Sequence, residues 1–431
     1  MHPVKIEISQ GRLIDPGTGL DRVASLHVDA GRIVGAGDAP AGWRADRVLD
    51  AGGCIVCPGL VDLSARLREP GLEHKATLES ELSAAVAGGV TSLACPPDTD
   101  PPLDEPGLVE MLKHRARTLN QAHVYPVGAL TAGLRGEALT EMSELAEAGC
   151  VAFSQADAPL VDTQVLLRAM QYAGTFGHRV WLRPQEAWLG RGGVAHDGEV
   201  ATRLGLPSIP VSAETIALAT IFALMRESGV PVHLCRLSSA AGVAMVRAAK
   251  EEGLPVTCDV AIHHLHLADV DIGWFDPLAN LTPPLRSTRD RAALRAAVAD
   301  GTIDAICSDH APVDDDGKQV PFGEAETGAT GLELLLPLTL KWAAEDRVPL
   351  PEAIDRITRA PASVIGVGKA TLEPGAAADI CVFDPQQAWT VRRQSLRSQG
   401  KNTPFLGLEV VGAVRWTLVE GEVVHQRNDK D

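Results

Sequence analysis

Alternating apolar and polar residues mark short strands at both ends of the chain. VKIEISQGRLID, ASLHVDAGRIVGAG and RVLDAGGCIVCPG are broken by glycine and aspartate, as expected for strands joined by tight turns. The same pattern returns near the C-terminus in ADICVFDPQQAWTV and VVGAVRWTLVEGEVVHQ. We therefore predict a small β-sandwich domain built from residues 1–57 and 366–431.

The long middle section, residues 58–365, alternates short apolar runs with helical segments. Eight runs are predicted strands: GLVDLSARL, TSLACPP, HVYPVGAL, CVAFSQ, RVWLRP, VPVHLCRL, LPVTCDVAI and IDAICSDHAP. Seven helical segments separate them: LESELSAAVAGG, PGLVEMLKHRARTL, TEMSELAEAG, TQVLLRAMQYAG, AETIALATIFALMRESG, AAGVAMVRAAKEEG and STRDRAALRAAVADG. Several end at glycine, which favours a helix C-cap. Eight strand–helix units predict an α/β fold, a (β/α)8 TIM-like barrel. Chemistry in such barrels lies at the C-terminal ends of the strands, so the polar residues there are the candidates.

Composition narrows the possible partners and compartments. The 431 residues carry a net charge of −17, which argues against broad binding to nucleic acid or to an anionic membrane. The start of the chain lacks a secretory signal pattern, and no apolar run is long enough for a membrane span. The eight cysteines are spread through apolar runs, and the C-x-x-C of Cys54 and Cys57 has no second pair. We expect a cytoplasmic protein with reduced, buried cysteines.

PGLVDLSARLREPG, from Pro58 to Gly71, resembles the first barrel strand of dihydroorotases and hydantoinases. Those enzymes carry D-x-H-x-H at this place, and dihydroorotases continue with L-R-E-P-G. The resemblance extends through AAVAGGVTSLACPPDTDP, HLCRLSSAAGVAMVRAAKEEGLPVTCDVAIHHLHL, DGTIDAICSDHAPV and the P-G-x-x-A-D-I pattern that begins at Pro374. It covers nearly the whole chain and implies a dihydroorotase-like member of the amidohydrolase superfamily.

The positions that hold metal ligands in this family are degenerate here. On the resemblance, five of the six carry other residues, and they are Ser64, Arg66, Gln155, Arg183 and Arg236. At the sixth position Asp309 retains the acidic residue of the family, which would also be the general base of an active enzyme. Zinc needs imidazole, thiolate or carboxylate donors, whereas a guanidinium has no acceptor lone pair and stays protonated. We therefore predict no catalytic residue beyond a vestigial Asp309, no bound metal and no cofactor.

The substrate side of the family site is also altered. Arg68 matches the family arginine that holds the substrate carboxylate, and a salt bridge to an acid at a strand end is the alternative role. Asp98 replaces a family asparagine and places an anion where an anionic substrate would bind. Two other family positions, an asparagine and a histidine, are Thr282 and Val313 here.

The arginine cluster leaves two interpretations open. Arg66, Arg183 and Arg236 fill the old metal cavity and pair with Asp309 and nearby acids, because buried charges must be paired to be tolerated. Alternatively the three arginines, with Arg68 and Asp98, bind an anion such as phosphate or carbamoyl phosphate.

The histidines are interpreted as structural residues. His264 and His266 are expected to share a strand face beside His263, and His233 to pack in the core. His310 is expected to anchor a loop.

Three functions follow from these alternatives. The first is a non-catalytic dihydroorotase-like subunit in pyrimidine biosynthesis, since such chains accompany the catalytic chain of aspartate carbamoyltransferase in some bacteria and help it to assemble. The second is an active amidohydrolase of dihydroorotase or hydantoinase type with a rebuilt site. The third is an anion-binding regulatory barrel. A homo- or hetero-oligomer is expected, with no nucleic acid or membrane partner.

Overall fold

The computed structural model describes residues 4–368 and 370–427, and its strands form two large sheets. One sheet is the parallel wall of a barrel, in which each strand pairs with the next along the chain. Its strands are β6 (Leu60–Asp62), β7 (Val90–Cys95), β8 (His123–Ala129), β9 (Ala152–Ser154), β10 (Val180–Leu182), β13 (Val232–Leu234), β14 (Val256–Ala261) and β15 (Ala305–Cys307). Each falls on one of the eight predicted runs, so the predicted (β/α)8 barrel is confirmed.

The barrel closes between its first and last strands, just beyond their C-terminal ends. An isolated parallel bridge joins Ala65 to His310. The His310 amide donates to the Ser64 carbonyl at 3.0 Å, and the Arg66 amide donates to the His310 carbonyl at 2.8 Å. The seam of the barrel therefore runs beside the old metal positions.

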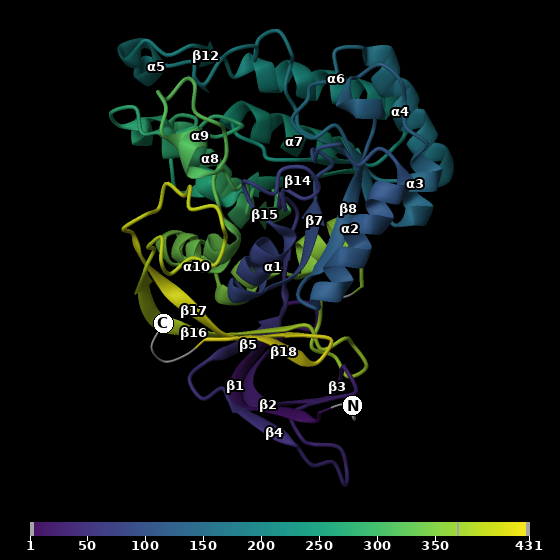
Figure 1. Ribbon diagram of the computed structural model, residues 1–431, viewed down its shortest axis with the longest axis vertical. Helices are drawn as coiled ribbons and strands as arrows, with labels where there is room; N and C mark the ends of the chain where they lie inside the picture. The colour runs from purple at the N-terminus through teal and green to yellow at the C-terminus, as the bar shows by residue number, and fades with distance from the viewer. Residues whose placement is uncertain (1–3, 369, 428–431) are drawn as a thin grey trace.

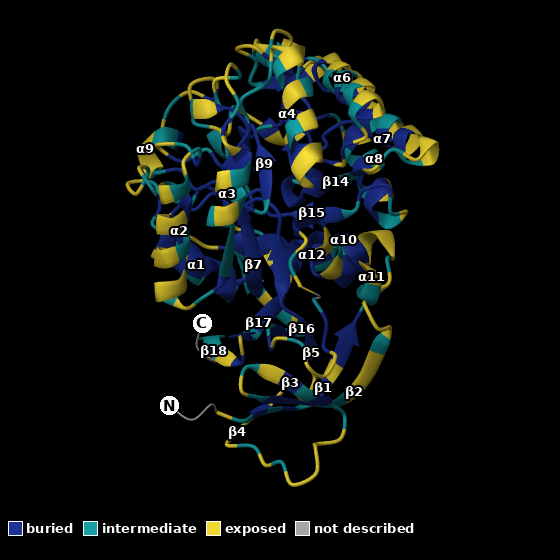
Figure 2. Ribbon diagram, turned by 90° about the vertical axis from the view of Figure 1, so that its right-hand side faces the viewer, coloured by how far each residue is buried: buried dark blue, intermediate teal, exposed yellow. Residues whose placement is uncertain are grey.

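Helices cover the outside of the barrel and turn their exposed faces to solvent (Figure 2). Seven coincide with predicted helical segments: α1 (Leu78–Ala87), α2 (Pro106–Leu119), α3 (Met142–Ala148), α4 (Thr163–Phe176), α6 (Ser212–Ser228), α7 (Ala240–Glu252) and α8 (Thr288–Ala299). Glycines such as Gly177, Gly229 and Gly253 end them in the left-handed conformation, as the sequence suggested.

Other short elements were not predicted. They are α5 (Glu199–Leu204), α9 (Asp315–Lys318), α10 (Leu335–Asp346), α11 (Leu350–Asp355), α12 (Arg359–Ile365) and the paired strands β11 (Ala195–His196) and β12 (Ser208–Ile209). The 3₁₀ helices are η1 (Ala132–Leu134), η2 (Ile262–Leu265), η3 (Asp269–Ile272), η4 (Pro277–Ala279) and η5 (Leu332–Leu334). The first five residues of α10 are all buried, so the first half of this helix has no polar stripe from which the sequence could reveal it.

The second large sheet unites the two ends of the chain. Its strands are β1 (Ile6–Asp15), β2 (Leu20–Asp29), β3 (Arg32–Ala36), β4 (Arg47–Asp50), β5 (Ile55–Pro58), β16 (Ile380–Thr390), β17 (Glu409–Val419) and β18 (Glu422–Gln426). β5 pairs in parallel with β1 and antiparallel with β16, which makes one hydrogen-bonded sheet below the barrel (Figure 1). Both chain ends therefore contribute to one β-domain, and its eight strands form a single continuous sheet.

All eight cysteines are free thiols, and seven of them are buried. Cys54 packs in the core of the β-domain, whereas Cys57 packs in the core between barrel and helices, so the C-x-x-C does not converge on one site. Among the described residues no helix is long and apolar enough to cross a membrane.

Candidate functional site

The six old metal positions come together at the C-terminal mouth of the barrel. Ser64 and Arg66 follow β6, Gln155 follows β9, Arg183 follows β10, Arg236 follows β13, and Asp309 follows β15. The side chains are almost fully enclosed, with Arg183 and Arg236 each only 4% exposed. The barrel therefore brings these six residues together in space.

Asp309, the one acid retained, is occupied by its neighbours. Its Oδ1 accepts Arg236 Nη1 at 2.9 Å and, at 3.4 Å each, Arg66 Nη1 and Ser64 Oγ. Two positive charges thus face the oxygen that would otherwise bind a metal or take up a proton.

Asp157 is the centre of the cluster, and the sequence analysis did not single it out. Its Oδ1 accepts Arg236 Nη2 at 2.6 Å and lies 2.7 Å from Arg183 Nε, while its Oδ2 accepts Arg66 Nη2 at 2.6 Å. Burial alone would raise the pKa of Asp157, but the charges of Arg236, Arg66 and Arg183 outweigh it and hold the pKa far below its ordinary value. The available signal was its place two residues after Gln155, in the segment where the family has adjacent acids.

Asp98 completes the charge balance. Arg66 Nε donates to Asp98 Oδ2 at 2.7 Å, so Arg66 contacts three carboxylates. Burial would lower the pKa of Arg66, but Asp98 and Asp157 raise it above its usual value. The three arginines are matched by three aspartates, and this pairing leaves little unbalanced charge for an added anion.

Arg183 and Gln155 are held by polar neighbours beside this cluster. Arg183 Nη1 donates to Gln185 Oε1, and Arg183 Nη2 donates to the Asp157 carbonyl at 2.9 Å. Gln155 exchanges hydrogen bonds with the Thr131 hydroxyl, at 3.0 Å for its Oε1 and 2.8 Å for its Nε2. The amide that replaces the family's bridging carboxylate is therefore bound to a neighbouring loop.

The residues at the mouth do not fit the family's metal centre. Arg66, Arg183 and Arg236 offer no lone pair, and their charges repel a dication by several kcal/mol at short range, even at an effective dielectric of about 20. Asp309 is the one carboxylate among the six positions, and arginines already surround it. We derive no reaction step through a metal at this site.

Arg68 lies beside the cluster and lines a cavity of about 350 Å³. Its Nε donates to the Pro312 carbonyl at 2.9 Å. This nitrogen therefore bonds a backbone oxygen, and not the strand-end acid that the sequence analysis gave as an alternative partner. Burial, and then the charge of Arg66, lower the pKa of Arg68. Thr282 contributes its carbonyl to Arg236 Nη1 at 3.3 Å, and Val313 is buried in the core.

Four residues of the mouth adopt a left-handed backbone although they are not glycine. They are Arg68, Ala156, Arg236 and Asp309, with φ values of 61°, 50°, 58° and 44°. This conformation costs about 1–2 kcal/mol per residue, and surrounding contacts must maintain it. At these four positions the contacts of the mouth hold a backbone conformation that non-glycine residues rarely adopt.

The histidines are placed differently from the sequence expectation. The strand ends at Ala261, and His263 and His264 lie in η2, so the expectation that His264 and His266 share a strand face is wrong. Burial lowers the pKa of each of these three histidines to about 4. They are neutral residues of the wall behind the mouth.

Two other histidines have acidic partners. His233 Nε2 lies 2.9 Å from Asp259 Oδ2. His310 Nε2 lies 2.5 Å from Glu81 Oε2, and its Nδ1 accepts the Gly331 amide at 3.1 Å. His310 therefore fastens the loop after β15 to helix α1.

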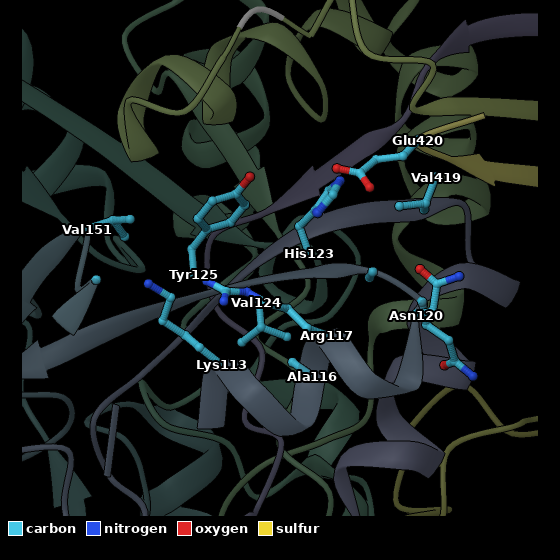
Figure 3. A pocket seen from close by; sticks show the side chains of 13 residues that line it. Lys113, Ala116, Arg117, Asn120, His123, Val124, Tyr125, Val151, Val419 and Glu420 are labelled. Atoms are coloured by element: carbon cyan, nitrogen blue, oxygen red, sulfur yellow. The ribbon is translucent and has the colours of Figure 1, made fainter. Parts of the chain in front are cut away.

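A larger hollow of about 510 Å³ lies at the opposite end of the barrel. Figure 3 shows His123 and Tyr125 of β8 beside Glu420, which follows β17. His123 Nε2 is 3.2 Å from Asp379 Oδ2, and this bond raises the His123 pKa. Because chemistry in such barrels lies at the other end of the strands, we assign this hollow to the joint between barrel and β-domain.

Comparison with known proteins gives two family matches. A model described as Dihydro-orotase-like matches residues 53–241, and a model of the Amidohydrolase family matches residues 193–424. A "Dihydroorotase-like protein" of Pseudomonas putida is 47% identical over 420 residues, covering 97% of this chain and 99% of that protein. Its namesake in Pseudomonas aeruginosa is 45% identical, covering 98% and 99%. A "Dihydroorotase" of Geotalea daltonii is 40% identical, covering 99% and 100%.

Solved structures share the fold. An L-hydantoinase from Arthrobacter aurescens superposes with a TM-score of 0.88 at 24% identity, covering 99% of this chain and 97% of that one. A D-hydantoinase gives a TM-score of 0.82 at 20% identity, covering 99% and 96%. At these identities the likeness establishes the architecture alone.

Proposed function

Because this chain belongs to the dihydroorotase-like family of the amidohydrolase superfamily, we propose that it is a catalytically inactive member of that family. Its role is to support the assembly of aspartate carbamoyltransferase, the transferase of pyrimidine biosynthesis. The barrel acts through its surface, and its mouth is a structural element.

The observation that carries this proposal is the ion-pair cluster at the mouth. Arg66, Arg183 and Arg236 stand where the family has imidazoles, and Asp157 and Asp309 bind their guanidinium groups. Without a metal there is no acidified water and no polarised carbonyl. Asp309 in particular has no water to deprotonate.

The names of the relatives are consistent with a dihydroorotase-like branch that is separate from the dihydroorotases. The two Pseudomonas proteins at 45–47% identity are called dihydroorotase-like, while the Geotalea protein at 40% is called dihydroorotase. A chain that keeps its whole hydrophobic architecture while its site is replaced is expected to work as a binding partner.

The inactivity is tested by assaying the purified chain in both directions, with dihydroorotate for ring opening and carbamoyl aspartate for ring closure. Zinc or cobalt is supplied, and hydantoin is included as a second cyclic substrate. We expect the rate of the buffer alone. Turnover that exceeds the buffer and disappears in Asp309→Ala would establish a rebuilt active site and refute the proposal.

The partnership is tested in the producing organism. A tagged copy of the chain is expected to co-purify with the catalytic chain of aspartate carbamoyltransferase, and deletion of its gene to leave a smaller, less active transferase. A transferase that reaches its normal size and activity in the deletion strain would refute the assembly role.

A further inference from the structure

A second set of metal donors lies inside the barrel, separate from the six old positions. His233 of β13 and Asp259 of β14 point inward together with Cys235, the residue that follows β13. One potential ligand atom from each lies within 4.8 Å of the other two. We propose that these three residues bind a transition metal of zinc type, in a structural site that joins the strands of the barrel.

The donor types match this class of ion. Zinc binds imidazole nitrogen, thiolate sulfur and carboxylate oxygen in compact sites. With Cys235 as thiolate, Asp259 as carboxylate and His233 neutral, the two negative charges balance a dication. None of the three groups is a guanidinium. The mouth differs in this respect, because Arg236, the residue after Cys235, places a guanidinium there.

The atoms that would bind the metal already face each other. His233 Nε2 and Asp259 Oδ2 are 2.9 Å apart, and the two side chains are 3% and 1% exposed. Binding displaces the ring proton from Nε2 to Nδ1 and releases the Cys235 thiol proton to solvent. Metal binding thus replaces the hydrogen bond between His233 and Asp259 and the S–H bond of Cys235 with bonds to the ion.

Neighbouring groups hold two of the donors in orientation. His233 Nδ1 lies 2.9 Å from the Thr257 hydroxyl, which can donate to that nitrogen before binding and accept from it afterwards. Asp259 Oδ1 accepts the Arg236 amide at 2.7 Å. Supporting hydrogen bonds of this kind orient metal ligands and raise their affinity.

A thiol on the next strand also bonds Asp259. Cys307 of β15 lies with its Sγ 3.5 Å from Asp259 Oδ1. The four side chains lie on or just after three adjacent strands, β13, β14 and β15, and Figure 2 shows β14 and β15 as largely buried. Cys235 is the one cysteine of the eight that is not buried.

The test measures metal binding directly. Purified full-length chain is loaded with cobalt(II), and the metal stoichiometry and the thiolate-to-cobalt absorption band are recorded. We expect one equivalent of cobalt with that band. We expect Cys235→Ser to lose the band and to weaken binding at least tenfold.

Cys258→Ser is the matched control, because Cys258 lies on β14 beside Asp259 but packs in the outer core. It should bind cobalt as the wild type does. Thr257→Val keeps all the donors and should weaken cobalt binding about 10–100-fold, which preserves a test if Cys235→Ser does not fold.

Wild-type chain that takes up no cobalt would overturn the proposal, as would a band that survives in Cys235→Ser. Hydrolysis is assayed separately. An inactive chain with this metal supports both proposals, and an inactive chain without it refutes the metal site alone.

Discussion

Arg236 Nη1 and Asp309 Oδ1 are 2.9 Å apart, so a permanent cation is bound to the acid that serves as general base in an active enzyme of this family. The same guanidinium reaches Asp157 through Nη2 at 2.6 Å. One arginine thereby satisfies two carboxylates that enter the mouth from different strands.

Removing that arginine should destabilise the fold. Arg236→Met leaves Asp157 and Asp309 with fewer cations, and breaking a buried ion pair from one side costs about 3–5 kcal/mol. Urea unfolding measures the change in unfolding free energy. Arg247→Met, which removes an exposed ion pair with Asp300, should cost about 1 kcal/mol or less, and equal losses in the two variants would contradict a structural role for the cluster.

Asp309 should be dispensable for the proposed partner function. In Asp309→Asn the group remains polar and of the same size, and its charge is lost. We expect transferase assembly, measured by gel filtration of the co-purified complex, to match wild type at a temperature where the variant is folded. Loss of the complex with a folded chain would show that the mouth itself takes part in binding.

Acid should weaken the fold through the buried histidines. The pKa of His263, His264 and His266 falls from 6.5 to about 4, so the unfolded chain takes up protons that the folded chain does not. Their effect is absent above pH 6.5, and unfolding free energy is lost as the pH falls from 6.5 to about 4. Burial raises the pKa of Asp62 to about 6 and that of Glu333 to about 7, and both act in the opposite direction, but three groups outweigh two.

His263→Gln tests this account. The variant removes one titrating group at a position that is 1% exposed, so the unfolding free energy should change less steeply with pH across that window. Urea unfolding at a series of pH values gives the slope. A slope identical to that of wild type would show that His263 is already protonated in the folded chain.

Glu81 should control the order of the segment between β16 and β17. Its carboxylate is fully buried and accepts Ser398 Oγ at 2.7 Å and the Gln399 amide at 2.9 Å, besides its contact with His310. Glu81→Ala should cost about 3–5 kcal/mol and speed amide hydrogen exchange in this segment. Glu79→Ala, at an exposed position on the same helix, should leave the exchange unchanged.

The sequence predicted the barrel because each strand is a short apolar run bounded by turn residues. Ser64 and Arg66 follow the first of these strands, and Asp309 follows the last. The sequence did not predict helix α10, because its first five residues are buried and show no alternation of polar and apolar faces. The extent of the strand before His263 was overestimated because its apolar residues continue into a 3₁₀ turn.

Asp157 shows what local patterns could not give. Its partners Arg66, Arg183 and Arg236 lie far from it in sequence, and the backbone turns at Ala156 with φ of 50° before it. The choice of acid that would neutralise the arginines depends on the closure of the barrel. The sequence thus identified the three arginines, and only the structure identified Asp157 as their shared partner.

The seam of the barrel gives the cluster a mechanical consequence. Arg66 follows the first strand and Asp309 follows the last, so their ion pair crosses the line along which the ring would open. Arg236 and Asp157 carry the same network to two further strands. Opening the barrel at this seam would break the ion pairs and the backbone hydrogen bonds at His310 together. The C-terminal rim should therefore resist partial opening and unfold in one cooperative step.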